Sequence, residues 1–328
     1  MKKLIALVLG ITLAYSCSTN SDGNGNSTTT VVPVAPSNLT GLVASSTQIN
    51  LSWTDNSTNE TGFKVERKTG TGTYAVIGTT ATDVTSFNDT GLMPGTIYTY
   101  RLYSYNTGGN SPTYSNELII TSRFIVTDID GNVYEAINIG SQIWTISNLN
   151  VSKYKDGTPI PQVSDPTQFY NLTTGAWTYY NNDPVNGAIY GKLYNWYAVA
   201  GIHDSDPNTP NKVLAPLGWH VPSDSEWTTL STFLGGESIA GAAAKEIGNL
   251  HWTSPNTGAS NSSGFTGLPG GIMHPTGTIS IGIRGNWWSS TQQSQIGAYG
   301  KELNNNNILF GRSSSAKALG FSVRFVKD

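Results

Sequence analysis

The chain has 328 residues, enough for two ordinary domains, and only 12% of them are charged, against about 25% in typical soluble domains. The net charge is −3 and no cluster of lysine or arginine occurs, so we expect no nucleic-acid partner. A single cysteine excludes intrachain disulfides and zinc sites built from cysteines, so each domain must depend on its own hydrophobic core.

Residues 1–17 have the pattern of a bacterial secretory signal that ends at a cysteine. Two lysines precede an apolar run, residues 4–13, which leads through small or polar residues into Cys17. This run is too short for a permanent membrane span, which takes roughly 20 residues. The segment resembles the lipobox of bacterial lipoproteins, although Ala14 and Tyr15 depart from its usual leucine and small residue. The resemblance implies that Cys17 is lipidated and becomes the mature N-terminus.

Two expectations about the N-terminal part follow from this pattern. A lipid on Cys17 anchors an exported protein to a membrane, and we expect the outer membrane or cell surface of a Gram-negative bacterium. The alternative is an ordinary signal peptide that is cut nearby, with Cys17 incidental. Residues 18–35 are rich in serine, threonine, asparagine and glycine and end in a proline-containing stretch, so we expect a flexible tether.

Residues 36–122 alternate apolar and polar side chains with the period of a β-strand. Ile49, Leu51 and Trp53 form one such run, and turn-forming clusters such as residues 70–72 separate it from the next. Short alternating strands at this spacing indicate an all-β sandwich.

The same region resembles the fibronectin type III family. Trp53 matches the tryptophan of the second strand, residues 60–67 match the third strand, and residues 92–98 match the tyrosine corner. The resemblance implies an immunoglobulin-like sandwich in which the Tyr98 hydroxyl bonds to backbone upstream of it. We expect this domain to act as a spacer, because a fold alone does not supply a function.

Residues 123–328 differ in character, and eight of the nine tryptophans lie there. Three blocks of this region, residues 139–149, 191–199 and 218–222, resemble the major paralogous domain named after Fibrobacter succinogenes and occur in that family's order. The resemblance extends from about residue 126 to the C-terminus.

A helix is predicted after Pro222 from the residues alone. Ser223 and Glu226 stand at capping-box spacing, and a pair of glycines at 235–236 ends the run. Four apolar residues fall on one helical face: Trp227, Leu230, Phe233 and Leu234.

The block at residues 218–227 also looks like a segment of formylglycine-generating enzymes and their relatives, and residues 320–326 look like their closing strand. This resemblance implies an α+β, C-type-lectin-like fold for residues 123–328. Those oxidases depend on two cysteines that hold copper, and residues 123–328 contain no cysteine. We therefore expect the scaffold without its chemistry, and a protein that is not an enzyme.

One short segment resembles the start of a calcium loop. Asp204, Asp206 and Asn208 place three oxygen side chains two residues apart, but the glycine and glutamate of a complete loop are missing. The interpretations are a partial Ca²⁺ site or an Asx-type turn, which this composition favours. None of the four histidines has a second ligand at metal-site spacing, and we expect no catalytic residue.

The adjacent pair Trp287 and Trp288 is the candidate ligand-binding site. Neighbouring side chains on a strand point to opposite faces, so one indole is expected to be buried and the other to face a surface, where it can stack on a sugar ring. The alternative is that both are core residues, as large aromatic residues usually are.

The sequence thus predicts a lipid-anchored surface protein that recognises a glycan or surface polymer through its C-terminal domain. Fold analogy, tryptophan content and low charge support this interpretation. Two alternatives are a structural envelope protein without a small ligand and an enzyme on the formylglycine-generating-enzyme scaffold, for which no nucleophile with a base is found.

Overall fold

The computed structural model describes residues 30–328. The predicted signal segment, Cys17 and most of the predicted tether lie outside these residues. Within the described part, no helix has both the length and the apolar character needed to cross a bilayer.

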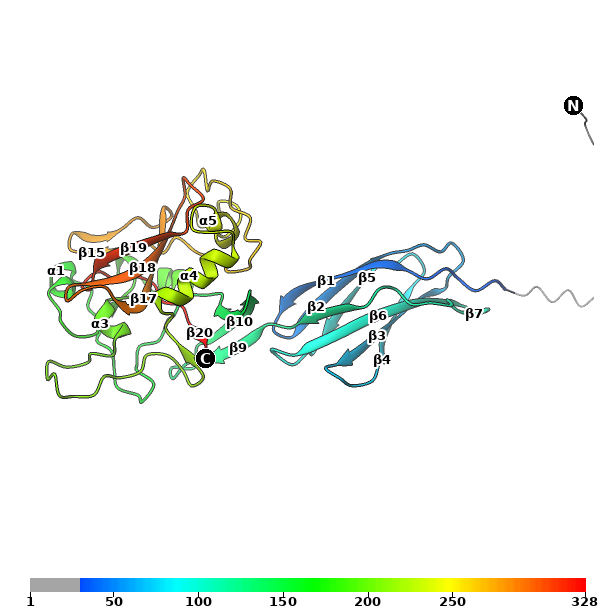
Figure 1. The fold of residues 1–328 in the computed structure, drawn as a ribbon, viewed down its shortest axis with the longest axis horizontal. Coiled ribbons are helices and arrows are strands. Elements are labelled where there is room, and N and C mark those ends of the chain that lie inside the picture. Colours follow the sequence, from blue (N-terminus) through cyan, green and yellow to red (C-terminus); the bar gives the residue numbers. More distant parts are fainter. Residues whose placement is uncertain (1–29) are drawn as a thin grey trace, which may run out of the picture.

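The first domain is a sandwich of two antiparallel sheets (Figure 1). One sheet contains β1 (Ser37–Ser45), β2 (Gln48–Thr54) and β5 (Ser86–Thr90) in the order β1-β2-β5. The other has the order β4-β3-β6-β7, with β8 also paired to β6; its strands are β3 (Gly62–Thr69), β4 (Ala75–Ala81), β6 (Ile97–Asn106), β7 (Gly109–Asn110) and β8 (Leu118–Thr121).

The alternation expected from the sequence places one face of each sheet in the hydrophobic core between the two sheets. Ile49, Leu51 and Trp53 of β2 are buried against residues of β3 and β6, and the Trp53 and Phe63 ring centroids lie 5.6 Å apart. The Tyr98 hydroxyl accepts a hydrogen bond from the Met93 backbone N–H at 2.9 Å, which confirms the predicted tyrosine corner.

The second domain is mostly β-structure with few short helices. Its main sheet has the order β14-β20-β11-β10-β9, formed by β9 (Phe124–Thr127), β10 (Val133–Ile139), β11 (Gln142–Thr145), β14 (Trp219–His220) and β20 (Val326–Lys327). A separate sheet consists of the consecutive strands β17 (Arg284–Gln292), β18 (Gly297–Asn304) and β19 (Gly311–Ala316). Two short pairs join β12 (Trp177–Thr178) to β13 (Leu193–Tyr194) and β15 (Ile272–His274) to β16 (Gly277–Ile279).

The helices of this domain are interspersed with its strands along the sequence. They are α1 (Pro166–Tyr170), the 3₁₀ turn η1 (Tyr180–Asn182), α2 (Pro184–Tyr190), α3 (Trp196–Val199), α4 (Asp224–Phe233) and α5 (Ala240–Ala244). The predicted capping box of α4 is present, and Trp227 and Leu230 are buried as expected. Phe233 is 62% exposed, so its predicted place on the buried face is wrong: α4 ends there, and the ring lies at the surface beside Gly140.

A short connection joins the domains, because β8 ends at Thr121 and β9 begins at Phe124. Arg123 pairs with Glu135 at 2.7 Å and donates to the Val43 carbonyl at 3.3 Å, while Glu135 accepts from the Ser46 backbone N–H at 2.9 Å. These bonds tie the connection to both domains. The described chain enters the sandwich at the end that carries β7 and leaves it at the opposite end (Figure 1).

Candidate functional site

The structure places both indoles of the predicted tryptophan site in the core. Trp287 and Trp288 are each 0% exposed, so the prediction that one of them faces a surface is wrong. The physical reason is that β17 is covered on both faces. Trp287 packs 5.8 Å from Phe265, and Trp288 stacks on Phe321 at 4.2 Å. All nine tryptophans are buried, so no indole is available to stack on a sugar.

A fully buried guanidinium lies beside this tryptophan pair. Arg324 donates to the Asn148 Oδ1 atom at 2.7 Å, and the same oxygen accepts from the Trp287 Nε1–H at 2.8 Å. Arg324 also donates to three backbone carbonyls, those of Thr145, Phe265 and Thr266. Burial lowers the pKa of Arg324 to about 9. With every partner supplied by the protein itself, this cluster holds the fold together and offers no group to a ligand.

The segment with the predicted calcium ligands forms two consecutive Asx turns. Asp204 Oδ1 accepts from the Asp206 backbone N–H at 3.0 Å, and Asp206 Oδ1 accepts from the Asn208 backbone N–H at 2.9 Å. The loop lines a cavity of about 390 Å³ together with Thr173 and His203. The geometry is that of the turn interpretation, and calcium binding by these residues stays a prediction.

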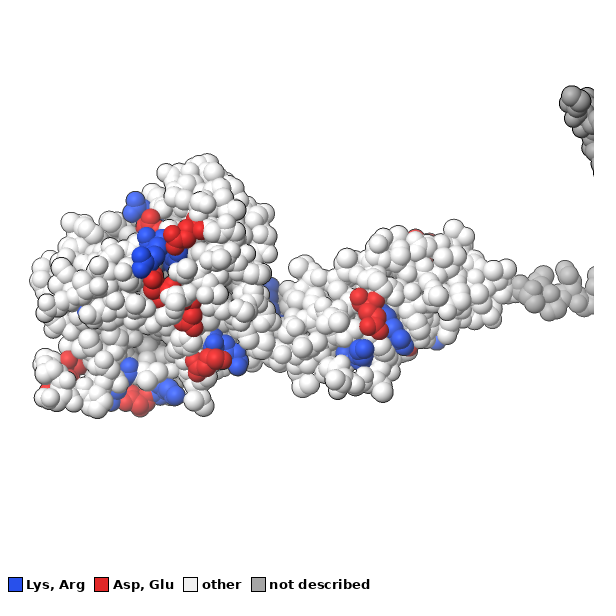
Figure 2. Space-filling view, viewed as in Figure 1, with Lys and Arg blue, Asp and Glu red and all other residues white. Residues whose placement is uncertain are grey.

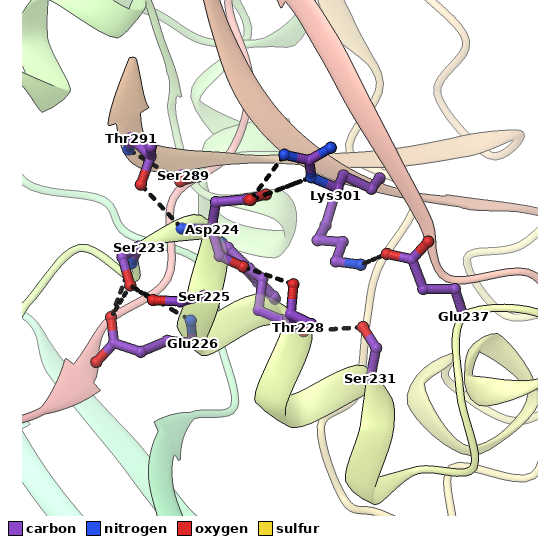
Figure 3. Close-up of polar contacts among 12 residues, drawn as sticks. Ser223, Asp224, Ser225, Glu226, Thr228, Ser231, Glu237, Ser289, Thr291 and Lys301 are labelled. Atoms are coloured by element: carbon purple, nitrogen blue, oxygen red, sulfur yellow. Dashed lines mark hydrogen bonds and ion pairs between the residues drawn. The ribbon is translucent and has the colours of Figure 1, made fainter. Parts of the chain in front are cut away.

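Charged groups around α4 are paired with one another (Figure 3). Asp224 accepts a bidentate interaction from Arg312, with distances of 2.8–3.1 Å, and Lys301 pairs with Glu237. Across the face shown in Figure 2, acidic and basic side chains likewise lie next to each other in small groups, and most of that face is uncharged. We infer that these paired charges stabilise the packing of α4 against the sheet of β17, β18 and β19.

His220 lies between two carboxylates. Its Nδ1 atom is 2.6 Å from Asp328 Oδ1 and its Nε2 atom is 2.7 Å from Glu226 Oε1. The His220 side chain is 41% exposed. Carboxylates only accept hydrogen bonds, so both ring nitrogens must carry protons for both bonds to form. The protonated ring and the two carboxylates form a charged cluster, which we call the His220 clamp.

A different surface feature has the properties of a recognition site. This feature is a cavity whose lining side chains are all uncharged, and we call it the neutral groove. Its lining residues are Ser164, Pro166, Thr178, Tyr179, Asn181, Asn182, Met273, Gly277 and Thr278. The cavity measures about 320 Å³. Serine, threonine, asparagine and tyrosine supply hydrogen-bonding groups around a ring that is only half-buried.

The two asparagines of the neutral groove are held in an uncommon conformation. Asn181 has φ +53° and Asn182 has φ +52°, values that non-glycine residues seldom adopt. Thr278 Oγ1 lies 2.5 Å from Asn181 Oδ1, and Gln162 Nε2 donates to Asn182 Oδ1 at 2.9 Å. Within residues 30–328, no hydrogen bond uses either amide Nδ2 group. Both side chains are exposed, so these donors can reach a ligand.

Tyr179 gives the groove its aromatic surface. Its ring packs edge-on against Trp177 with centroids 5.0 Å apart, and Lys192 Nζ lies 5.5 Å from its centroid. Gly187 must be glycine, because a Cβ there would lie 2.2 Å from the Tyr179 ring. The ring is therefore held in place before any ligand arrives.

Comparison with known families identifies both domains. Residues 137–327, more than half of the chain, match the model of the Fibrobacter succinogenes major domain. The chain belongs to this family. Residues 34–121 match the fibronectin type III domain, so the predicted order of the two domains is confirmed. We refer to residues 137–327 as the major domain.

Individual proteins match only parts of the chain. Exoglucanase B of Cellulomonas fimi is 32% identical over 114 residues, which are 34% of this chain and 10% of that protein. An α-amylase of Niallia circulans is 36% identical over 89 residues, 26% of this chain and 6% of that protein. The chain thus spans a tenth or less of these relatives. The solved Fn3-like protein from Clostridium thermocellum is 30% identical and covers 26% of this chain and 90% of its own, with a TM-score of 0.24.

The neutral groove was not predicted from the sequence of the major domain. Its local signal is the pair Asn181-Asn182 just before Asp183-Pro184, because asparagine tolerates the left-handed conformation and Asp-Pro begins a helix. Thr278 reaches the pair from the β15–β16 hairpin, almost one hundred residues later. No spacing rule connects these segments.

The His220 clamp predicts how the stability of the major domain depends on pH. Burial alone would lower the pKa of His220, but hydrogen bonds to Asp328 and Glu226 and their charges raise the pKa above 6.5. Burial alone would raise the pKa of Glu226, but hydrogen bonds from Ser223 and His220 lower the pKa below 4.5. The clamp should thus make its full contribution to the free energy of unfolding of the major domain between pH 4.5 and 6.5.

We therefore expect His220→Gln to be less stable than the original protein mainly in that window. The difference should shrink as the pH rises through the raised pKa of His220, and also as it falls through the lowered pKa of Glu226. Solvent screening limits the difference to about 1 kcal/mol or less. Urea denaturation at several pH values measures it, and a difference that grows from pH 6 to pH 9 would contradict the assignment.

Proposed function

We propose that the protein is an exported, lipid-anchored surface protein whose major domain binds neutral carbohydrate in the neutral groove. The observation that carries this proposal is the groove itself: two exposed amide donors and a fixed tyrosine ring within a lining that has no charged side chain. A polyhydroxyl ligand without charge matches such a surface, because hydroxyl groups accept from amides and a sugar face packs on an aromatic ring.

The comparisons support an association with carbohydrate. Both curated relatives, the exoglucanase and the α-amylase, are named as carbohydrate-cleaving enzymes. We propose for this chain recognition without cleavage, since the neutral groove has no carboxylate in its lining and glycoside hydrolysis generally needs two. We further propose that the major domain has the C-type-lectin-like scaffold, in line with the position of β20 between β14 and β11 in its main sheet.

The fibronectin type III domain is proposed to be a spacer between anchor and major domain. The tether side of the sandwich is bound by Asn59 and Asn106, whose Nδ2 groups both donate to the Val31 carbonyl at 2.8 Å. The major domain is held at the opposite end by Arg123 and Glu135 (Figure 1). The described chain therefore enters the sandwich at the end opposite the domain that carries the neutral groove (Figure 1).

Replacing Cys17 with serine tests the anchor. The variant should move from the membrane fraction to the soluble fraction, because it lacks the thiol that receives the diacylglyceryl group and with it about 0.8 kcal/mol of membrane affinity per buried methylene. Cell fractionation with a high-salt wash measures the change. A variant that still sediments with membranes would refute lipid anchoring.

A glycan array probed with the purified chain tests recognition. Neutral glycans should be bound in preference to sulfated glycans and uronates, because the lining of the groove contains no cation to pair with an anion. Binding to anionic glycans alone would rule out the groove as the site. Binding to no glycan at all would leave the structural envelope protein as the better account.

A further inference from the structure

Three carboxylates meet at one end of the fibronectin type III sandwich. Asp55 and Glu60 lie in the loop between β2 and β3, and Asp83 lies in the loop between β4 and β5. Each of them offers an oxygen atom, and these oxygens all lie within 4.8 Å of one another. We call this group the carboxylate cluster.

Glu60 is the unusual member of the cluster. The residue is 6% exposed, and its Oε1 atom accepts from the Asp83 backbone N–H at 3.3 Å. Its Oε2 atom is buried and has no hydrogen-bond partner among residues 30–328. A buried carboxylate oxygen to which the protein donates no hydrogen bond is unfavourable, because burial keeps it from the bulk solvent.

In the part of the chain that the structure describes, no positive side chain pairs with the cluster. Among the ion pairs of residues 30–328, none includes Asp55, Glu60 or Asp83. Three carboxylates this close to one another repel, and burial of Glu60 strengthens the repulsion because fewer water molecules screen it. A cation in contact with all three would offset this repulsion.

We propose that Asp55, Glu60 and Asp83 bind a calcium ion. Oxygens that hold one Ca²⁺ at about 2.4 Å can lie no more than about 4.8 Å apart, a limit that the cluster meets. The ligands are all hard carboxylate oxygens. Such a ligand set favours calcium over zinc and copper, which prefer histidine or cysteine. Two loops form the site, and Ca²⁺ tolerates irregular geometry better than Mg²⁺ does.

Calcium at this position would join the two loops at the end where the tether enters. Thr82 Oγ1 already donates to the Glu60 carbonyl at 3.2 Å, and Asn59 Nδ2 donates to the Val31 carbonyl at 2.8 Å. The ion would thus stiffen the attachment point of the tether. This inference does not depend on the proposed binding of carbohydrate.

Calorimetry on the whole purified chain tests the site. After treatment with a chelator, titration with CaCl₂ should release heat with a dissociation constant of about 0.1–1 mM, the range of extracellular modules. In scanning calorimetry, 10 mM CaCl₂ should raise the melting temperature of the fibronectin type III transition by roughly 5–15 °C. A chain whose melting is unchanged by CaCl₂ would overturn the proposal.

Variants locate the ion. Glu60→Gln removes the buried charge at nearly constant shape, and Asp83→Asn suits the left-handed backbone of residue 83, with φ +60°, and serves if the first variant does not fold. Both should lose the calcium-dependent shift, whereas Asp206→Asn in the second domain is the matched control and should keep it. If only Asp206→Asn loses the shift, calcium binds in the 204–208 loop and the proposal is wrong.

Discussion

Replacing Arg324 with methionine is expected to lower the free energy of unfolding of the major domain by about 3–5 kcal/mol. The guanidinium is fully buried, and its removal leaves the carbonyls of Thr145, Phe265 and Thr266 without their donor. Each buried acceptor left in this way costs about 1–3 kcal/mol. Removing the desolvated charge offsets part of that cost, so the expected loss of stability is smaller than the summed cost of three unpaired carbonyls.

Denaturation followed by tryptophan fluorescence measures this loss, because eight of the nine tryptophans report on the major domain. Arg324→Lys is the matched control for charge. It keeps a cation but not the planar fork that reaches four acceptors, so it should also be destabilised, though less than Arg324→Met. If Arg324→Met unfolds at the same urea concentration as the original protein, Arg324 does not organise the core.

The second large effect is expected at the buried tryptophans. Trp287→Ala and Trp288→Ala should each cost about 3–5 kcal/mol of stability, since each removes a packed indole that is 0% exposed. Each also leaves an acceptor, Asn148 Oδ1 or the Tyr194 carbonyl, with one donor fewer.

Phe233→Ala is the matched aromatic control for the tryptophan variants. The ring is 62% exposed, so its loss should cost under about 1 kcal/mol. Thermal melting of the three variants measures the contrast. If Trp287→Ala or Trp288→Ala melted with the control and bound carbohydrate less well, the indole would be a ligand contact after all.

Most predictions that depend on neighbouring residues are confirmed in this chain, and the exposed Phe233 at the end of α4 is the exception. The alternation around Trp53, the tyrosine corner at Tyr98 and the capping box of Ser223 and Glu226 all involve residues at most a few positions apart. Backbone geometry and hydrogen-bond reach fix such patterns without reference to the rest of the fold.

Predictions that depend on what covers a surface are less secure. Alternation shows that Trp287 and Trp288 point to opposite faces of β17, but it cannot show that both faces are covered. Phe265 and Phe310 pack on one indole and Phe321 on the other, from segments outside the named strands and elsewhere in the chain. The neutral groove and the carboxylate cluster likewise join segments far apart in sequence, which a single sequence does not pair.

The most direct test of the proposed function is affinity gel electrophoresis. The gel contains a neutral polysaccharide that the protein has been found to bind on the glycan array. The double variant Asn181→Gly/Asn182→Gly removes both amides of the neutral groove, and glycine keeps the backbone at φ +53° and +52°. Asn38→Gly is the matched control, with the same substitution at φ +53° in the fibronectin type III domain.

We predict that the original protein and Asn38→Gly are retarded equally and that the double variant is not. Two lost hydrogen bonds of about 1 kcal/mol each correspond to roughly a 30-fold weaker affinity. Equal retardation of all three proteins would contradict the account, because the neutral groove would then not be the binding site.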